Sequence, residues 1–148
     1  MLSRIRGSSN LFFEVLLFFG LVIVIIFFTI RYYEQIQLKM KVAQVADYAE
    51  SVITTINNLK ELTGSYSDSD ITAENVLQKL SGVSVPFQVQ FTRYDGQASS
   101  YKVIFAGKMP DNCCPLVIEK LLADTKTSKI VQPQCLDGGF TFTYDSTQ

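Results

Sequence analysis

The residue types that most often carry chemistry in proteins are scarce in this chain. It has no histidine, the commonest general base and metal ligand at neutral pH. Its cysteines are Cys113, Cys114 and Cys135, and none of them forms the Cys-x-x-Cys pair typical of a zinc site. Because no nucleophile–base pair and no set of metal ligands is recognisable, we expect no enzymatic activity, no metal and no other cofactor.

Thiol oxidation is the chemistry that these cysteines could do. If this part of the chain lies outside the cytoplasm, where thiols are oxidised, Cys113 or Cys114 should bond Cys135. Adjacent cysteines rarely bond each other, because the peptide geometry strains the bridge. Helical periodicity places Cys114 on one face with Ile118 and Leu121, which slightly favours a Cys114–Cys135 disulfide and leaves Cys113 as the alternative partner. The remaining thiol is either buried and inert or paired between molecules.

Glu14 is the one charge in an otherwise apolar run, Leu11 to Ile30. A helix of that length spans about 30 Å, the hydrocarbon thickness of a bilayer, so the run predicts a membrane span. A carboxylate near the start of such a span costs about 2–3 kcal/mol or more and tends to mark a function. The alternative is that Glu14 lies near the lipid headgroups and is solvated.

The residues on either side of the apolar run predict its orientation. Met1 to Asn10 is short and basic, and positive residues beside a span stay on the cytoplasmic side, so the rest of the chain should face outward. Tyr32 and Tyr33 follow the run, as is typical of a membrane–water boundary. The run is longer than the apolar part of a cleaved secretory signal and no Ala-x-Ala-like site follows it, so we interpret it as a retained span.

The helical pattern continues beyond the span to Leu62-Thr63-Gly64, where Gly64 can adopt a left-handed cap. Apolar residues alternate at spacings of four and three, which places them on one stripe. These residues are Leu38, Val42, Val45, Ala49, Val52, Ile56 and Leu59. The stripe is either a coiled-coil seam or the floor of a domain core, and we prefer the core because roughly eighty further residues must bury their apolar side chains.

The rest of the chain predicts short elements. We expect Asp70 to cap a helix at Ile71–Leu80, and strands at Phe87–Phe91 and Tyr101–Phe105 to form a hairpin around the turn signal Asp95-Gly96. We also expect a helix at Pro115–Leu122 and a short strand at Ile130–Gln132. A turn at Asp137-Gly-Gly should then lead into a last strand, Phe140–Tyr144. The class is α+β, with a small antiparallel sheet packed against the long, first hydrophobic and then amphipathic helix.

A short basic leader, Met1–Gly7, precedes the apolar helix, which starts Leu11-Phe-Phe-Glu14-Val and has Gly20 six residues after the acid. Leu59–Tyr66 ends the long helix, and Cys114–Cys135 is followed by a final alternating strand. In this order, these features resemble the type IV pilins, and within that class the type IVb and plasmid thin-pilus subunits. The resemblance covers nearly the whole chain and implies the type IV pilin fold.

The resemblance implies four regions. Residues 1–7 would be a leader, 8–30 the transmembrane and filament-core helix, 31–63 its amphipathic continuation, and 64–148 a globular αβ domain with a C-terminal disulfide loop. It also implies a structural subunit that waits in the bacterial inner membrane and then joins identical subunits in an extracellular helical filament for adhesion, conjugation or aggregation. Its other partners would be a prepilin peptidase and a pilus assembly platform.

The resemblance also assigns roles to individual residues. The peptidase would cut between Gly7 and Ser8, Glu14 would attract the N-terminal amine of a neighbouring subunit, and Gly20 would serve assembly as a flexible point or a helix contact. In the family the acid is the fifth residue of the mature protein. A cut after Gly7 makes Glu14 the seventh, whereas a cut after Ser9 would make it the fifth.

Other classes remain open. A minor pilin or pseudopilin of a pilus or secretion machine would share the fold and the membrane anchor. A bitopic membrane protein with an outer sensing or binding domain would retain residues 1–7 and would not need Glu14. Nucleic acid is not expected as a partner, because the net charge is −1 and the basic residues are spread along the chain.

Overall fold

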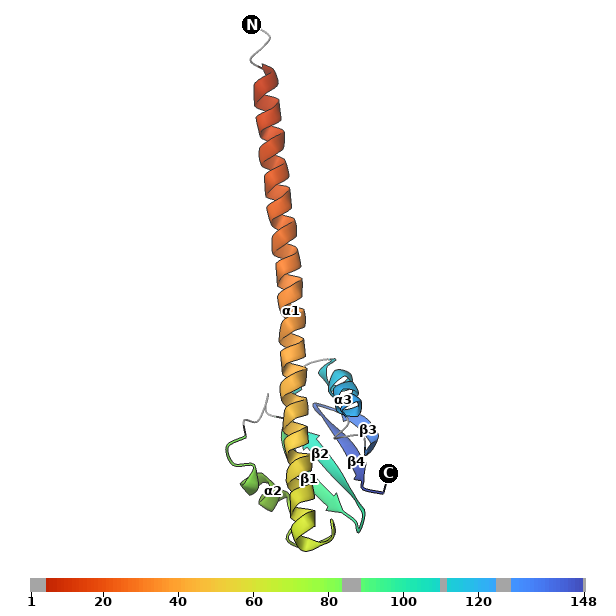
Figure 1. Ribbon diagram of the computed structural model, residues 1–148. Helices are drawn as coiled ribbons and strands as arrows, with labels where there is room; N and C mark the ends of the chain where they lie inside the picture. The colour runs from red at the N-terminus through yellow and green to blue at the C-terminus, as the bar shows by residue number, and fades with distance from the viewer. Residues whose placement is uncertain (1–4, 84–88, 110–111, 125–128, 148) are drawn as a thin grey trace. The chain divides into compact units, whose positions relative to one another are not determined.

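The computed structural model describes residues 5–83, 89–109, 112–124 and 129–147, with side chains described from residue 10 onward. Two compact units divide the chain, Met1–Leu38 and Lys39–Gln148, which we call the N-terminal and C-terminal units. The elements, shown in Figure 1, confirm the α+β class. They are α1 (Ile5–Thr63), α2 (Ala73–Lys79), β1 (Gln90–Gly96), β2 (Ser100–Ala106), α3 (Cys113–Ala123), β3 (Ile130–Leu136) and β4 (Gly139–Asp145).

Helix α1 ends where the sequence predicts. It contains no proline, and its last residue is Thr63. Gly64 has a φ of +88°, and its N–H donates to the Lys60 carbonyl at 2.7 Å. This left-handed conformation satisfies a terminal carbonyl at little steric cost because glycine has no Cβ.

The predicted stripe of α1 lies in the core of the C-terminal unit. From Val42 to Leu59 its side chains are at most 7% exposed, and Ala46, Tyr48 and Ile53 widen it. Tyr48 contacts the sheet directly: its ring centroid lies 6.0 Å from that of Phe105. The stripe is therefore a domain core and not a coiled-coil seam, and each large side chain buried there contributes about 1.5–3 kcal/mol.

The four strands form one antiparallel sheet in the order β1-β2-β4-β3. Alternate residues of β2 point into the core, as the period-two pattern predicts. Aromatic pairs connect the strands: Phe105 lies opposite Phe140 on β4 with stacked rings 4.6 Å apart, and opposite Phe91 on β1 at 5.9 Å. Such cross-strand pairs fix the register of the sheet.

The predicted start of α2 is wrong. Thr72, not Asp70, is the N-cap, and its hydroxyl accepts from the Asn75 N–H at 3.2 Å. Asp70 belongs to the preceding turn, where its N–H donates to the Asp68 carboxylate at 2.9 Å. Aspartate and threonine both suit caps and turns, so local sequence did not decide between them.

The predicted hairpin turn is also wrong. Asp95 and Gly96 are the last residues of β1 and lie opposite Lys102 and Tyr101, and the connection to β2 is formed by residues 97–99. Strand β1 begins at Gln90, and the part of the predicted strand at residues 87–88 lies outside the described residues. Glycine is needed at this position because the backbone of Tyr66 approaches it closely. A Cβ at Gly96 would lie 2.0 Å from the Tyr66 carbonyl oxygen.

We predict that Gly96→Ala destabilises the C-terminal unit by about 1–3 kcal/mol, because backbone must move to admit the methyl group. Urea unfolding of the full-length protein in detergent, followed by near-ultraviolet circular dichroism, measures this change. Gln97→Ala, at the exposed neighbouring position, should stay within about 0.5 kcal/mol of the wild type. Equal stability of the two variants would contradict the close approach.

Beyond β2, the structure extends two predicted elements. Helix α3 covers Cys113–Ala123 and so includes both adjacent cysteines. Strand β3 continues past the predicted Gln132 to Leu136, although its pairing with β4 is irregular between Val131 and Gln134. Gln132 has a φ of +53° there, and a proline follows it. Proline removes a strand hydrogen bond and fits only at a sheet edge or bulge, which is why the pattern alone ends the strand early.

Four tyrosines gather where the loop after α1 meets the sheet. Tyr101 stacks on Tyr144 at 5.0 Å and contacts Tyr66 at 4.9 Å and Tyr94 at 5.7 Å. The Tyr66 hydroxyl donates to Asn57 on α1, and the Tyr94 hydroxyl donates to the Tyr66 carbonyl. Within the described residues, the buried hydroxyl of Tyr101 has no hydrogen-bond partner. These tyrosines fix the end of α1 and its loop to strands β1, β2 and β4.

The tyrosine cluster predicts alkaline unfolding. Burial raises the pKa of Tyr66, Tyr94 and Tyr101 above the ordinary value of 10.0, and neighbouring tyrosines raise it further. A raised pKa means that the folded state favours the neutral phenol, so this stabilisation is complete below pH 10 and is lost as the pH rises above it. Above about pH 10, we expect tyrosinate absorbance to increase and the near-ultraviolet circular dichroism signal to decrease over the same pH range.

The variant Tyr101→Phe tests whether the tyrosine cluster causes the alkaline unfolding. It removes a buried, unpaired hydroxyl, and we expect it to raise the free energy of unfolding at neutral pH by about 1 kcal/mol. It should also shift the alkaline transition to higher pH, because one buried phenol no longer ionises on unfolding. A transition that occurs at the same pH in this variant would show that the cluster does not control alkaline stability.

Candidate functional site

The main candidate site is the apolar segment Leu11–Ile30 of the N-terminal unit. Except for the half-buried Val22, its large apolar side chains are 46% to 71% exposed within the chain. Among the described residues, α1 is the one helix long and apolar enough to cross a membrane. A continuous apolar surface of this size needs lipid or protein around it, because water exposure costs about 25 cal/mol per Å².

Glu14 lies on this segment with its side chain exposed. Within the described residues it has no ion pair or hydrogen bond. An unpaired carboxylate is unfavourable in an apolar surrounding, so a covering of lipid or protein favours neutralisation, solvation or pairing of Glu14.

Gly20 and the predicted cleavage site occupy different parts of the same helix. A Cβ at Gly20 would meet nothing within 4 Å, so no contact inside the chain requires glycine there. Any role of Gly20 is therefore in helix flexibility or in contact with another helix. Gly7 and Ser8 belong to the first turns of α1, but their side chains lie outside the description.

Polar side chains mark the end of the apolar segment. The Arg31 guanidinium carbon lies 5.5 Å from the ring centre of Phe27, a cation–π distance. Four residues apart on the helix, Gln37 donates to the hydroxyl of Tyr33 at 2.9 Å. Arginine and tyrosine suit the membrane–water interface because each joins an apolar body to a polar tip.

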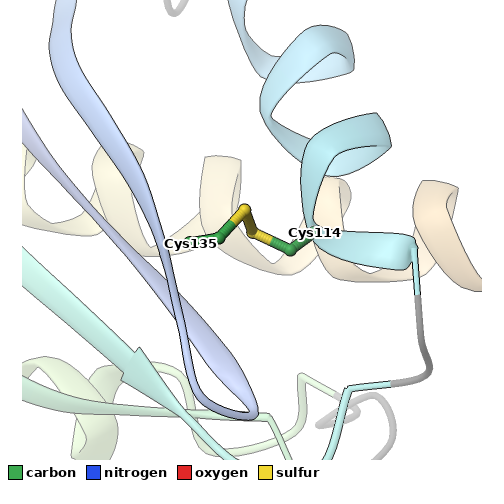
Figure 2. The surroundings of a disulfide bond; sticks show 2 residues. All are labelled: Cys114 and Cys135. Atoms are coloured by element: carbon green, nitrogen blue, oxygen red, sulfur yellow. A yellow bond between two sulfur atoms is a disulfide. The ribbon is translucent and has the colours of Figure 1, made fainter.

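The second candidate site is the disulfide between Cys114 and Cys135. Figure 2 shows the two side chains meeting between the first turn of α3 and strand β3. Their Cα atoms are 5.9 Å apart, and 21 positions separate them in the sequence. The bond ties α3 to the edge of the sheet.

The favoured pairing of Cys114 with Cys135 is confirmed, but the face of Cys114, Ile118 and Leu121 is not the buried face of α3. The buried face of α3 carries Cys113, Val117 and Leu121, at spacings of four. Cys114 lies beside this face and is half-buried, and Cys135 is exposed on the edge strand β3. A cysteine beside the core face reaches that edge, whereas one on the core face points into the unit.

Cys113 is the free cysteine of the described residues, and it is fully buried. Burial raises the pKa of its thiol, and the charge of Lys41 offsets part of this effect. A buried thiol with a raised pKa is a poor nucleophile at neutral pH. Cys113 therefore acts as a small core residue.

Acidic side chains flank the contact between α1 and α3. Lys120 forms an ion pair with Asp47 at 3.3 Å. Burial raises the pKa of Glu50, and the nearby carboxylate of Asp124 raises it further. Within the described ranges no three Cys, Asp or Glu side chains gather as a metal site. The exposed Lys120–Asp47 pair joins α3 to α1 and contributes little stability, since exposed pairs are worth at most about 1 kcal/mol.

The structure brings together one pair of the predicted site residues, Cys114 and Cys135. Glu14 and Gly20 share the apolar segment of the N-terminal unit. From the sequence, Arg31 is one of the residues that follow the apolar run at the predicted membrane–water boundary, and it received no role in assembly. Sequence reasoning also missed the tyrosine cluster, whose members are far apart in the sequence and fall in three strands and a loop.

The fold and these sites define an α+β protein that has, in the part of the chain that the structure describes, one candidate membrane-spanning helix and one disulfide. Comparison of the chain with protein-family models, curated proteins and solved structures gives no match.

Proposed function

We propose that this protein is the structural subunit of a type IVb-like pilus. It is held in the inner membrane by the first part of α1 and polymerises through the same surface into an extracellular filament. The observation that carries the proposal is the exposed apolar segment Leu11–Ile30, on a helix whose later residues form the core of an α+β unit. The Cys114–Cys135 disulfide supports it, because disulfides persist in oxidising compartments.

The apolar surface serves as anchor and as assembly interface in turn. Lipid tails are as apolar as leucine, so replacing lipid by identical helices keeps the side chains away from water. Dispersion contacts between closely packed helices then favour the bundle. Because neighbouring copies join through different faces, the contact does not close and the assembly grows as a filament.

Glu14 makes the bundle selective. An apolar surface alone specifies no axial register, since apolar contacts are non-directional. A buried carboxylate has to meet a cation, and only some offsets between neighbouring helices bring one close. In the pilins that the sequence resembles, this cation is the N-terminal amine of a neighbour, which requires removal of the leader.

Microscopy and mass analysis test the proposal. A surface fraction sheared from cells that produce the protein is examined by negative-stain microscopy with an antibody against the C-terminal unit. Intact-mass measurement of the membrane form and of the sheared form shows whether residues 1–7 are removed. We expect labelled filaments in which this protein is the main component and a mass that lacks the leader.

Each alternative class gives a different result. A minor pilin or pseudopilin would be processed but scarce in the filaments, with label confined to few points. A bitopic membrane protein would remain in the membrane fraction with residues 1–7 retained and would form no filaments. That last result would overturn the proposal.

A further inference from the structure

We propose that Arg31 of one copy is the ion-pair partner of Glu14 of the next copy in the filament. The pairing rests on the proposed function and identifies the contact that sets the axial offset. Both residues are exposed on the N-terminal unit, and Glu34 is the other charged residue of that unit from residue 10 onward. Within the described residues, neither Glu14 nor Arg31 has an ion-pair partner.

Arginine is chemically suited to this position. Its guanidinium stays charged in any surrounding and can hold a carboxylate through two parallel hydrogen bonds. Its contact with Phe27, at 5.5 Å from the ring centre, keeps the cation beside the apolar segment. Unlike a new N-terminal amine, the guanidinium does not depend on where the leader is cut.

The spacing defines an offset. Glu14 and Arg31 are 17 positions apart, so a neighbour displaced by about 26 Å along the helix axis brings them level. At 3.6 residues per turn, the two side chains leave the helix about 100° apart. One helix can therefore offer Glu14 to one neighbour and Arg31 to another, which is the non-closing arrangement that a filament needs.

The same offset covers apolar side chains beyond the membrane span. It places Val15–Leu21 of one copy level with Tyr32–Leu38 of the next. In the single chain Tyr32 is 67% exposed, Tyr33 62% and Ile36 37%. These side chains follow the lipid-length segment, and an adjacent apolar helix at this height would remove them from water.

Charge reversal tests the pairing in the full-length protein. We expect Glu14→Arg and Arg31→Glu each to lower the amount of filament in the sheared fraction at least a hundredfold. The double variant, which restores opposite charges at the same offset, should recover at least half of the wild-type amount. Glu34→Gln is the matched control and should stay within twofold of the wild type.

Membrane levels make the result interpretable. Both reversals favour the same orientation, because one adds a positive charge at the cytoplasmic end and the other removes one from the outer end. Immunoblots should therefore show wild-type amounts of every variant in the membrane. If the wild type itself forms no filaments, the proposed function fails. If the wild type assembles and Arg31→Glu assembles equally well, or the double variant stays at the level of the single variants, the pairing is overturned.

Cross-linking gives a second readout that leaves both charges in place. Phe18 and Gln35 lie one turn beyond Glu14 and Arg31, on the same faces and at the same offset. The variant Phe18→Cys/Gln35→Cys should form intermolecular disulfides in oxidised filaments, seen as a ladder of multimers. Leu16→Cys/Gln35→Cys, with the first cysteine on the opposite side of the helix, should give at least fivefold less. Equal ladders would contradict the offset.

Discussion

Glu14→Ala is expected to leave the protein in the membrane and to reduce its incorporation into filaments at least a hundredfold. Alanine removes the carboxylate but leaves the neighbour's cation buried, and an unpaired buried charge costs about 3–5 kcal/mol. Each 1.4 kcal/mol changes an equilibrium about tenfold, so this cost is enough for the expected loss. Anchoring should not suffer, because removal of a charge makes insertion into lipid more favourable by about 2–3 kcal/mol.

Two measurements are needed for this variant. Immunoblots of the membrane fraction check retention, and immunolabelled filaments in the sheared fraction check assembly. Val15→Ala, the adjacent uncharged substitution on the same segment, is the control and should assemble nearly as the wild type does. Normal piliation by Glu14→Ala would refute the role of the carboxylate in assembly.

The second large effect is expected in the C-terminal unit. Replacing Cys114 and Cys135 together by serine should lower its free energy of unfolding by about 3 kcal/mol, since the bridge no longer restricts the unfolded chain. This is a large share of the stability of a small domain, and the thermal midpoint should fall by about 10 °C or more. Urea and thermal unfolding of the full-length protein in detergent, followed by near-ultraviolet circular dichroism, measure both values.

The third cysteine provides the controls. Cys113→Ala should cost only about 1 kcal/mol, because it removes one small buried group and leaves the disulfide intact. Cys114→Ser should be nearly as unstable as the double variant, because Cys113 points into the core and α3 would have to rotate before it could reach Cys135. Full stability of the wild type under a strong reductant would contradict the contribution of the bridge.

Periodicity correctly predicted the helices and strands in which apolar residues repeat at the spacing of an α-helix or a β-strand. The stripe of α1 from Val42 to Leu59, the alternation of β2 and the last strand were recognisable because burial repeats along each of them. Gly64 was recognisable as the end of α1 because a left-handed cap is a local requirement. These features depend on neighbours in the sequence.

The errors occurred where distant contacts decide the conformation. Asp95-Gly96 has the composition of a turn, but the approach of the Tyr66 carbonyl places the glycine in a strand. The favoured Cys114–Cys135 pairing is confirmed, but helical spacing did not show that Cys113 lies on the core face of α3, because that depends on how α3 packs.

The candidate assembly site also has a part that could be predicted from the sequence and a part that could not. The apolar segment and its single acid could be recognised from the sequence alone, because a long run of apolar residues with one charge is visible without a structure. The partner of Glu14 does not follow from helix periodicity within one chain, because Arg31 is too distant to reach it in the same helix. It becomes apparent only when a second, displaced copy is considered.

The edges of the sheet have a consequence for how copies of this protein can aggregate. The sheet ends in β3 on one side, where the positive φ of Gln132 and Pro133 interrupt the regular strand. On the other side, β1 is irregular between Phe91 and Arg93 and is contacted by α2. Irregular edges resist pairing with a foreign strand. In the proposed filament, crowded C-terminal units should therefore not nucleate amyloid-like sheets. Growth by addition of subunits would then use the apolar segment of α1 and its charged residues.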